Sequence, residues 1–408
     1  MRILLLTSYF PPEIGSASHL FHDIGAALVE RGHEVEVITG IPSYHAKGRG
    51  QTKRFIAHES MTGMDVTRVW VPQIARDTPA GRGFWQLASA AAFAAAAFRR
   101  KRSDAVLVYS PPLTLGLTAL MLRVFRRVPF VINVQDLFPQ SAIDLGILRQ
   151  PFLIKAARWL ERFLYSRAEA LSFHSRGNLE HAVGVGADRS KCEVVHNCVD
   201  TAHLESEHDS TYYKGELGLE GHFIASFAGV MGYSQDLDVI LETAKMFEDD
   251  EEVAFLLVGD GVEKERLVAK ADSMDLPNVV WMPMQPRGRY PRILHSSDVC
   301  LTTLEAEVKT PVVPSKIISA MAAGRPVIAA LDPNGDAPAL LQEVGCGVAI
   351  APEDPVALAD AISLLRAEPD LREKMGSEGR RFAEEHCSPE SVAAQYEKIF
   401  ERIAGSGS

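Results

Sequence analysis

The sequence predicts an α/β fold built from two open, doubly wound parallel sheets. The chain has 408 residues, which exceeds the usual size of one domain and favours two domains of about 200 residues each. Its apolar segments are mostly short continuous runs without alternation, as expected for strands buried on both faces. Amphipathic helical segments separate most of these runs, and such βα repetition produces parallel sheets.

Six strands are expected in each half of the chain. Those of the first half are Ile3–Thr7, Val35–Thr39, Ala105–Tyr109, Phe130–Val134, Ala170–Phe173 and Cys192–Val195. Those of the second half are Ile224–Ala228, Ala254–Val258, Val279–Met282, Val299–Thr302, Val327–Ala330 and Gly347–Ile350. The segments His19–Arg31 and Asp236–Phe247 are typical of the helices between them.

The domain boundary is expected in a polar stretch. Residues 201–221 lack a long apolar run, which is typical of a connection. We therefore expect an N-terminal domain over residues 1–205, a linker over 206–221 and a C-terminal domain over 222–388. Residues 389–408 hold a last helical stretch, which could pack back on the N-terminal domain, and a GSGS tail.

The composition indicates a globular protein of a reducing compartment. The five cysteines are scattered and include no Cys-x-x-Cys pair, which argues against disulfides or a zinc site. The first apolar run meets Pro11 too early for the core of a signal peptide. These features predict a cytoplasmic protein.

The charge is distributed unevenly between the two halves. Residues 1–200 carry 24 Lys and Arg against 17 Asp and Glu, whereas residues 201–408 carry 18 against 36. A basic half favours a polyanionic neighbour, either nucleic acid or an anionic membrane surface. No nucleic-acid recognition motif is found, so we expect a membrane surface and no nucleic acid.

Two apolar segments of the basic half end in arginines. Phe84–Phe98 runs into Arg99, and Leu113–Phe125 runs into Arg126. Neither reaches the roughly 20 residues needed to span a bilayer. They are either core helices with solvated basic ends, or a lipid-facing surface with a basic rim that binds the inner face of the membrane peripherally.

The triplet Pro314-Ser315-Lys316 stands directly before a helix of small residues. A helix N-terminus presents free N–H groups and the positive end of its dipole, so it can bind an anion. Lysine is normally disfavoured at that end, which suggests that the dipole and the ammonium group share an anion. The alternative is an ordinary helix with an exposed lysine.

Eight motifs in a fixed order resemble those of family 4 glycosyltransferases with the GT-B fold. They are Pro11-Pro12-x-x-Gly15, Arg31-Gly32-His33-Glu34-Val35, Asp136-Leu137-Phe138-Pro139, Val195-His196-Asn197-x-x-Asp200, Ala228-Gly229, Val258-Gly259-Asp260-Gly261, Ser297-Asp298-Val299 and Met321-Ala322-Ala323-Gly324-Arg325-Pro326-Val327. The resemblance covers essentially the whole chain. It implies two Rossmann-like domains, with the donor mainly on the second domain and the acceptor on the first.

The resemblance also implies a chemistry. A sugar would pass from a nucleotide to an acceptor with retention of configuration and without a metal or other cofactor. Asp136 and Glu307 would be catalytic, and His174 and Glu305 could contact the sugar. The donor and its phosphates would be bound by Gly15, Ser16, Gly229, Gly232, Gln235, Gly259, Pro314, Ser315, Lys316 and Ser319.

Several positions depart from the family pattern. Gln135 replaces a common His, and Ser319 stands where a Glu usually holds the ribose. Val230 and Gln235 occupy the places of a phosphate-binding Arg and Lys, so Lys316 is the candidate that replaces the missing charge.

The Pro-Ser-Lys variant resembles a bacterial branch that builds capsule, O-antigen or exopolysaccharide. The resemblance implies a UDP-linked, N-acetylated hexosamine donor and a polyprenyl-diphosphate-linked acceptor. Two alternatives remain open, a UDP-sugar 2-epimerase and a non-catalytic partner subunit of a polysaccharide assembly complex.

Overall fold

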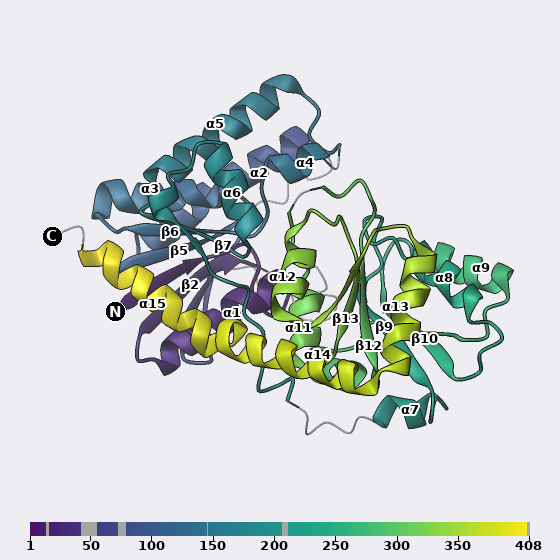
Figure 1. Ribbon diagram of the computed structural model, residues 1–408. Helices are drawn as coiled ribbons and strands as arrows, with labels where there is room; N and C mark the ends of the chain where they lie inside the picture. The colour runs from purple at the N-terminus through teal and green to yellow at the C-terminus, as the bar shows by residue number, and fades with distance from the viewer. Residues whose placement is uncertain are drawn as a thin grey trace. The chain divides into compact units, whose positions relative to one another are not determined.

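The structure is a computed structural model that describes residues 1–13, 16–41, 55–71, 79–144, 146–205, 211–309 and 311–405. The chain divides into two compact units (Figure 1). Unit 1 comprises Met1–Cys198 and Pro389–Ser408, and unit 2 comprises Val199–Ser388. Each unit has one central sheet with helices on both faces, as the alternation of strands and helices predicts.

Unit 1 contains an eight-stranded sheet in the order β3-β4-β2-β1-β5-β6-β7-β8. All neighbouring pairs are parallel except β3 and β4. Its strands are β1 (Arg2–Leu6), β2 (Glu34–Gly40), β3 (Ile56–Met61), β4 (Met64–Val69), β5 (Ala105–Ser110), β6 (Phe130–Val134), β7 (Ala170–Phe173) and β8 (Cys192–Val194). Its helices are α1 (Ser16–Glu30), α2 (Pro79–Ala97), α3 (Leu115–Arg126), α4 (Gln140–Asp144), α5 (Pro151–Arg167), α6 (Arg176–Gly184), the 3₁₀ turn η1 (Arg189–Lys191) and α15 (Pro389–Gly405).

Unit 2 contains a six-stranded, all-parallel sheet in the order β11-β10-β9-β12-β13-β14. Its strands are β9 (Phe223–Val230), β10 (Val253–Asp260), β11 (Val279–Met282), β12 (Val299–Thr303), β13 (Val327–Ala330) and β14 (Gly347–Ile350). Its helices are α7 (Tyr212–Glu216), α8 (Asp238–Met246), α9 (Lys264–Met274), η2 (Arg287–Arg289), α10 (Tyr290–Ser296), α11 (Ser315–Ala322), α12 (Asp336–Val344), α13 (Pro355–Ala367), α14 (Pro369–Phe382) and the π-helical turn η3 (Ala383–Cys387).

The twelve expected strands are confirmed, each within a few residues of its expected bounds. The strands β3 and β4 were not expected. They form an antiparallel hairpin at the edge of the sheet, closed by Thr62 (φ 47°) and Gly63 (φ 79°). Positive φ at both turn residues matches the twist of a two-residue hairpin.

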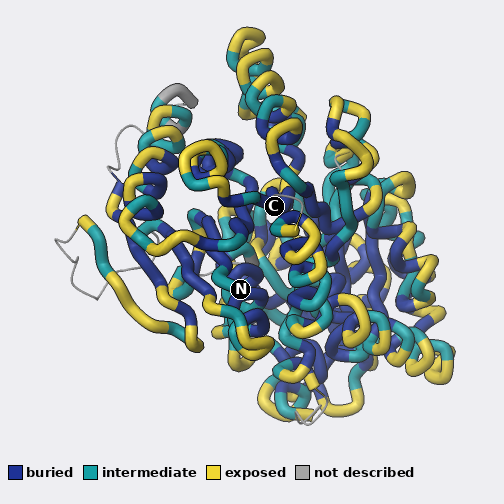
Figure 2. The backbone as a smooth tube through the Cα atoms, turned by 90° about the vertical axis from the view of Figure 1, so that its left-hand side faces the viewer, coloured by how far each residue is buried: buried dark blue, intermediate teal, exposed yellow. Residues whose placement is uncertain are grey.

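Hydrophobic side chains cover both faces of the unit 1 sheet. Figure 2 colours the buried residues of the backbone dark blue. One core cluster includes Phe93 of α2 and Leu122 of α3, and the other includes Phe21 of α1 and Phe400 of α15. The apolar segments of α2 and α3 are therefore core helices along these faces. Their outer edges stay exposed, most of all at Phe125. Among the described residues, none of the helices combines the length and the hydropathy that a membrane span requires.

The chain passes from unit 1 to unit 2 at Cys198 and Val199. Residues 211–221 lie within the range expected for the linker, yet they belong to unit 2 and include α7. The reason is that Tyr213 is buried in a core cluster with Ile224 and Ile293. Residues 206–210 of the expected linker lie outside the described residues.

Helix α15 belongs to unit 1, although α14 of unit 2 precedes it in the chain. It packs along α1, where Glu397 accepts a hydrogen bond from His33 at 2.9 Å and pairs with Arg31. Tyr396 packs inward and accepts a hydrogen bond from Asn133 of β6 at 2.7 Å. The last helix of the chain thus completes the first unit.

A buried carboxyl on α5 makes the stability of the protein depend on pH. Burial raises the pKa of Glu161 to about 7, despite the opposing effects of Arg158, Arg162 and a hydrogen bond with Tyr165. A raised pKa means that the folded state binds this proton more tightly than the unfolded state, so stability is lost as pH rises from about 4.5 to about 7. We expect Glu161→Gln to raise the free energy of unfolding by about 2 kcal/mol at pH 8 and to change it little at pH 4.5.

Urea unfolding at the two pH values measures this difference. The control is Glu180→Gln, because a hydrogen bond from Arg189 lowers the pKa of Glu180. That variant should gain no stability at pH 8. An equal effect of Glu161→Gln at both pH values would contradict the prediction.

Candidate functional site

The candidate site of unit 2 lies at the carboxyl ends of β9 and β12. These strands are neighbours in the sheet, but the chain continues from β9 toward β10 and β11, and from β12 toward β13 and β14. The strand order therefore reverses between β9 and β12. In open parallel sheets, ligands bind outside the carboxyl ends of the strands at such a point.

Lys316 reaches across the end of β9 from the first turn of α11. Its Nζ donates a hydrogen bond to Oε1 of Gln235 at 2.5 Å and lies 3.9 Å from the centroid of the Phe227 ring. A Cβ placed on Gly229 would lie 3.5 Å from the same Nζ. The structure thus brings together Lys316, Gln235 and Gly229, three residues that the sequence predicts to bind the donor.

The ammonium group of Lys316 is poorly solvated. Burial lowers the pKa of Lys316 to about 7, because desolvation disfavours the charged form. Its hydrogen-bond acceptor is the neutral amide of Gln235 rather than a carboxylate. An anion placed here would supply the missing counter-charge and raise the pKa again.

The carboxyl ends of β9 and β10 pack backbone against backbone. Gly229 and Gly259 lie opposite one another in the strand register, and a Cβ on Gly259 would fall 1.9 Å from the carbonyl oxygen of Gly229. Gly261 has φ +156°, and a Cβ there would fall 2.2 Å from the oxygen of Met231. Glycine at these two positions lets the backbone segments beside Lys316 approach one another closely, so that backbone atoms line this part of the site.

Helix α11 presents two more of the expected donor residues. It follows the N-cap Pro314 and begins at Ser315, which is exposed at the N-terminus. Ser319 lies one turn further on, and its hydroxyl is hydrogen-bonded with Tyr290. A Cβ on Gly232, in the loop after β9, would meet no atom within 4 Å. Their role in donor binding stays a prediction.

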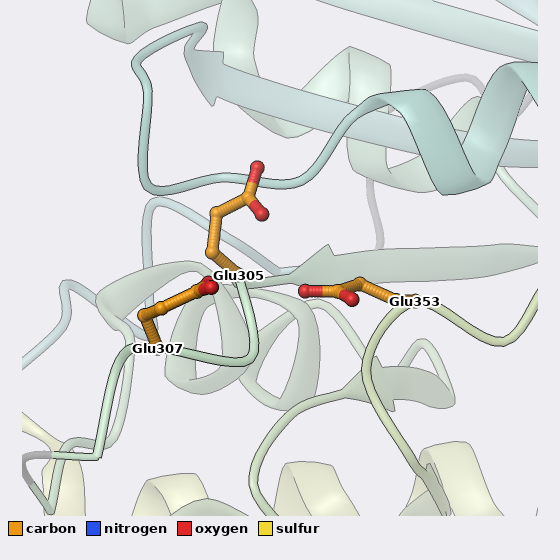
Figure 3. Close-up of side chains that lie close together, drawn as sticks. All are labelled: Glu305, Glu307 and Glu353. Carbon is orange, nitrogen blue, oxygen red and sulfur yellow. The ribbon is translucent and has the colours of Figure 1, made fainter.

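Three glutamates gather beside this edge of the sheet (Figure 3). Glu305 and Glu307 follow β12, and Glu353 follows β14; their carboxylate oxygens all lie within 4.8 Å of one another. The backbone fixes the group, since Ala306 N donates to Glu353 Oε1 at 3.0 Å and Glu305 N donates to Ser234 O at 3.1 Å.

The three carboxylates repel one another, so hydrogen-bond donors or a cation from a ligand would stabilise them. The pKa of Glu305 is raised, first by burial and then by the charges of Asp236, Glu353 and Glu307. Such a group suits the hydroxyls of a sugar, and its spacing also admits a divalent cation. The sequence prediction missed Glu353, because it is far from Glu305 and Glu307 along the chain. Its backbone also adopts an unusual positive φ of 58°.

In unit 1, Asp136 follows the buried strand β6 at the carboxyl end of the sheet. It is exposed at the surface, and desolvation by the protein around it raises the pKa of its carboxyl. Burial also raises the pKa of Tyr109, with the charge of Asp136 as the next cause. Asp136 and Glu307 lie on different units.

Two other residues singled out in the sequence of unit 1, Gln135 and His174, have buried side chains. Gln135, at the usual His position, donates to Oδ1 of Asn133 at 2.8 Å. His174 is 5% exposed and its Nε2 lies 2.7 Å from Nδ2 of Asn178 in α6. Gly15 lies outside the described residues, and Ser16 is the first residue of α1, with its side chain outside them.

Two family models match this chain. Residues 15–198 match the model described as "Glycosyl transferase 4-like domain", and residues 211–382 match "Glycosyl transferases group 1". The chain is 23% identical over 406 residues to WcaI of Escherichia coli, named as a colanic acid biosynthesis glycosyl transferase, covering 97% of this chain and 98% of WcaI. It is 27% identical over 267 residues to WbjE of Pseudomonas aeruginosa, named as a glycosyltransferase, covering 65% of this chain and 66% of WbjE.

The fold is also that of solved structures, among them a glycosyltransferase from Rickettsia africae, which matches with a TM-score of 0.70 at 16% identity, over 98% of this chain and 98% of that chain. HepE of Anabaena, solved in complex with UDP, matches with a TM-score of 0.74 at 17% identity, over 99% of this chain and 100% of that chain. Both sheets, the order of the motifs and the two matched models agree. The chain therefore belongs to the family 4 glycosyltransferases with the GT-B fold, with a glycosyl transferase 4-like domain followed by a group 1 domain.

Proposed function

We propose that this glycosyltransferase moves a sugar, an N-acetylated hexosamine, from UDP to a polyprenyl-diphosphate-linked acceptor in the synthesis of a bacterial surface polysaccharide. Transfer retains the anomeric configuration and needs no metal. The enzyme works in the cytoplasm at the inner face of the membrane. The names of WcaI and WbjE support the class of reaction, the name of WcaI supports the pathway type, and the UDP in the HepE structure supports the nucleotide.

The observation that carries this proposal is the placement of Lys316. A half-buried ammonium group lies at the N-terminus of α11 and above the backbone of Gly229, and among the described residues it has no carboxylate acceptor. A diphosphate carries the charge that this position lacks, and the helix N-terminus adds free N–H donors.

In the proposed reaction, the bond between the anomeric carbon and the diphosphate oxygen breaks while the acceptor oxygen bonds to the same face of that carbon. The acceptor proton passes to the leaving diphosphate. Negative charge grows on the diphosphate as its bond breaks, so Lys316 stabilises the transition state more than the bound donor. Glu305 and Glu307 accept hydrogen bonds from the sugar, and Asp136 orients the acceptor side.

One observation favours a second candidate, a non-catalytic partner subunit. Val230 stands at the place of a phosphate-binding Arg with 63% of its surface exposed, and the Ser319 hydroxyl is already engaged by Tyr290. A subunit that had lost donor binding would tolerate both. UDP binding separates the candidates, because the enzyme must hold the diphosphate and the subunit need not.

A transfer assay tests the proposal. The protein is incubated with UDP-N-acetylhexosamine and a short-chain polyprenyl-diphosphate saccharide, with and without EDTA. We expect product in both samples, with the anomeric configuration of the donor seen by NMR. UDP binding without transfer would refute the acceptor class, and loss of transfer in EDTA would refute metal independence. Failure to bind UDP would favour the non-catalytic subunit.

The binding of UDP should depend on pH through Lys316. Its pKa of about 7 means that the free protein carries the cation below pH 7 and loses it above. We expect the Kd of UDP to be about tenfold higher at pH 8.5 than at pH 6.5, since the proton must be regained on binding. Calorimetric titration in matched buffers measures both the affinity and the proton uptake.

The control for the pH dependence is Lys316→Ala. In this variant the affinity should be low and change little between pH 6.5 and 8.5, because the last pKa of the phosphate is near 6 and UDP is already mostly ionised at pH 6.5. An equally steep pH dependence in Lys316→Ala would assign the effect to another group.

A further inference from the structure

The outer face of α5 carries aromatic and basic side chains together. Phe152, Lys155, Trp159 and Arg162 recur at steps of three, four and three residues, so they lie on one face of the helix. Phe152 is 69% and Trp159 is 63% exposed. Figure 1 shows α5 along the outer edge of unit 1.

Two aromatic rings of α5 stack on one another, and a cation lies over one of them. The rings of Trp159 and Phe163 stack with centroids 5.2 Å apart and an interplanar angle of 6°. The guanidinium group of Arg167 lies 5.4 Å from the centroid of the Phe163 ring. Aromatic rings and basic side chains therefore lie next to one another along this face.

The charge of this face is of one sign. Helix α5 has four basic residues, Lys155, Arg158, Arg162 and Arg167, and its only acidic residue, Glu161, is buried on the opposite face. Within the described ranges, none of the four cations pairs with a carboxylate. Arg158 donates to the neutral amide of Gln140 at 3.2 Å, and Arg162 donates to the carbonyl oxygen of Arg158.

We propose that α5 docks the protein on an anionic phospholipid bilayer, with Phe152 and Trp159 inserted at the headgroup boundary and the cations on lipid phosphates. Aromatic rings prefer the membrane interface, and each Lys or Arg near an anionic surface adds attraction. Helix α5 itself has four cations and no exposed carboxylate, which fits an anionic bilayer by charge, and its exposed rings fit the acyl boundary. The nearby Asp144 of α4 is exposed and accepts a hydrogen bond from Gln140 at 2.7 Å.

This inference rests on the proposed function at the membrane and names the element that makes the contact. For α2 and α3 the sequence left two alternatives open, core helices or a lipid-facing surface, and most of their apolar residues lie in the core. The competing surface is formed by the exposed apolar side chains of α2 and α3, which are Phe84, Leu87, Met121, Val124 and Phe125, with Phe125 the most exposed.

Vesicle flotation of the full chain tests the inference without donor or acceptor. The vesicles contain phosphatidylcholine with or without 30 mol% phosphatidylglycerol. Wild type should float with the anionic vesicles, and Phe152→Ala/Trp159→Ala should partition at least about tenfold more weakly. Lys155→Gln/Arg167→Gln should lose about 20- to 30-fold on anionic vesicles only, and both effects should leave UDP binding unchanged.

The matched control is Val356→Ala/Leu364→Ala, which removes two exposed apolar side chains eight residues apart on α13 of unit 2. It should bind vesicles like wild type. Equal flotation of the α5 variants and wild type would overturn the inference, as would a loss seen only in Val124→Ala/Phe125→Ala. A wild-type dimer that the α5 variants convert to a monomer, without vesicle binding, would show that a second copy of the chain covers this face.

The two proposals fail in different ways. Absent flotation with intact UDP binding and sugar transfer would refute the role of α5 alone. Normal flotation without UDP binding would refute the proposed transferase function and leave the lipid-binding face standing.

Discussion

Replacing Lys316 with alanine is expected to weaken UDP binding about 100-fold at pH 6.5. The substitution removes a charged hydrogen-bond donor from a desolvated position where the diphosphate has few other cations, since Val230 and Gln235 replace two of them. UDP at about 100 times its Kd stabilises wild type by roughly 2.7 kcal/mol, and the same concentration should stabilise the variant by only about 0.4 kcal/mol. Thermal shift with and without UDP measures this difference.

Transfer should fall more than binding does. Because negative charge grows on the leaving diphosphate, we expect Lys316→Ala to lower kcat about 10²- to 10³-fold in addition. The control is Lys309→Ala, which lies on the loop before α11, is mostly exposed and pairs with Asp332 at 3.3 Å. Lys309→Ala should bind UDP like wild type. Equal UDP stabilisation of Lys316→Ala and wild type would exclude Lys316 from the diphosphate site.

The buried parallel strands could be predicted from the sequence for a physical reason. A strand covered on both faces needs apolar side chains at every position, so segments such as Phe130–Val134 and Val327–Ala330 stand out as continuous runs. The turns that follow them contain Gly, Pro or Asp and mark their ends. The bounds of both strands agree with the structure residue for residue.

The hairpin of β3 and β4 lacks that signal. The edge strand β3 has one neighbour, and many of its side chains meet solvent. It therefore contains the polar residues His58, Glu59 and Ser60, and it has no continuous apolar run from which a strand could be predicted. The only local indication is Thr62-Gly63 between two short segments. Positive φ at a threonine is rare, and a propensity rule would not have placed a turn there.

The candidate site was predicted unevenly. Lys316 was singled out from the rule that lysine is unfavourable at a helix N-terminus, and the resemblance supplied Gly229 and Gln235. Local sequence carries no sign of Phe227 under the ammonium group or of Glu353 beside Glu305, because these contacts depend on how loops after different strands fold over one sheet edge.

The network behind Asp136 was missed for a similar reason. Asn133 Nδ2 donates to the hydroxyl of Tyr396 at 2.7 Å, and that hydroxyl lies 2.9 Å from Ser172 Oγ. Tyr396 is 263 residues from Asn133 along the chain. Only the return of α15 to unit 1 brings them together, and the sequence left the docking of that helix open.

Gly259→Ala is expected to be the most damaging substitution at the donor site. A Cβ at this position would fall 1.9 Å from the carbonyl oxygen of Gly229, a backbone atom that cannot rotate away as a side chain would. The strands β9 and β10 must separate at their carboxyl ends, where they bond in register. We expect a loss of about 3–5 kcal/mol in the free energy of unfolding, measured in urea, because overpacking against backbone leaves little room for relaxation.

Gly259→Ala should also lose UDP binding, even at temperatures at which this variant stays folded. A shift of the Gly229 carbonyl would move the backbone that lies against Lys316, whose Nζ lies 3.5 Å from the position of a Cβ on Gly229. The matched control is Gly288→Ala in η2, where a Cβ would meet no atom within 4 Å. If Gly259→Ala unfolded at the same urea concentration as Gly288→Ala and bound UDP like it, the close packing of the carboxyl ends of β9 and β10 would have no role in holding the diphosphate site.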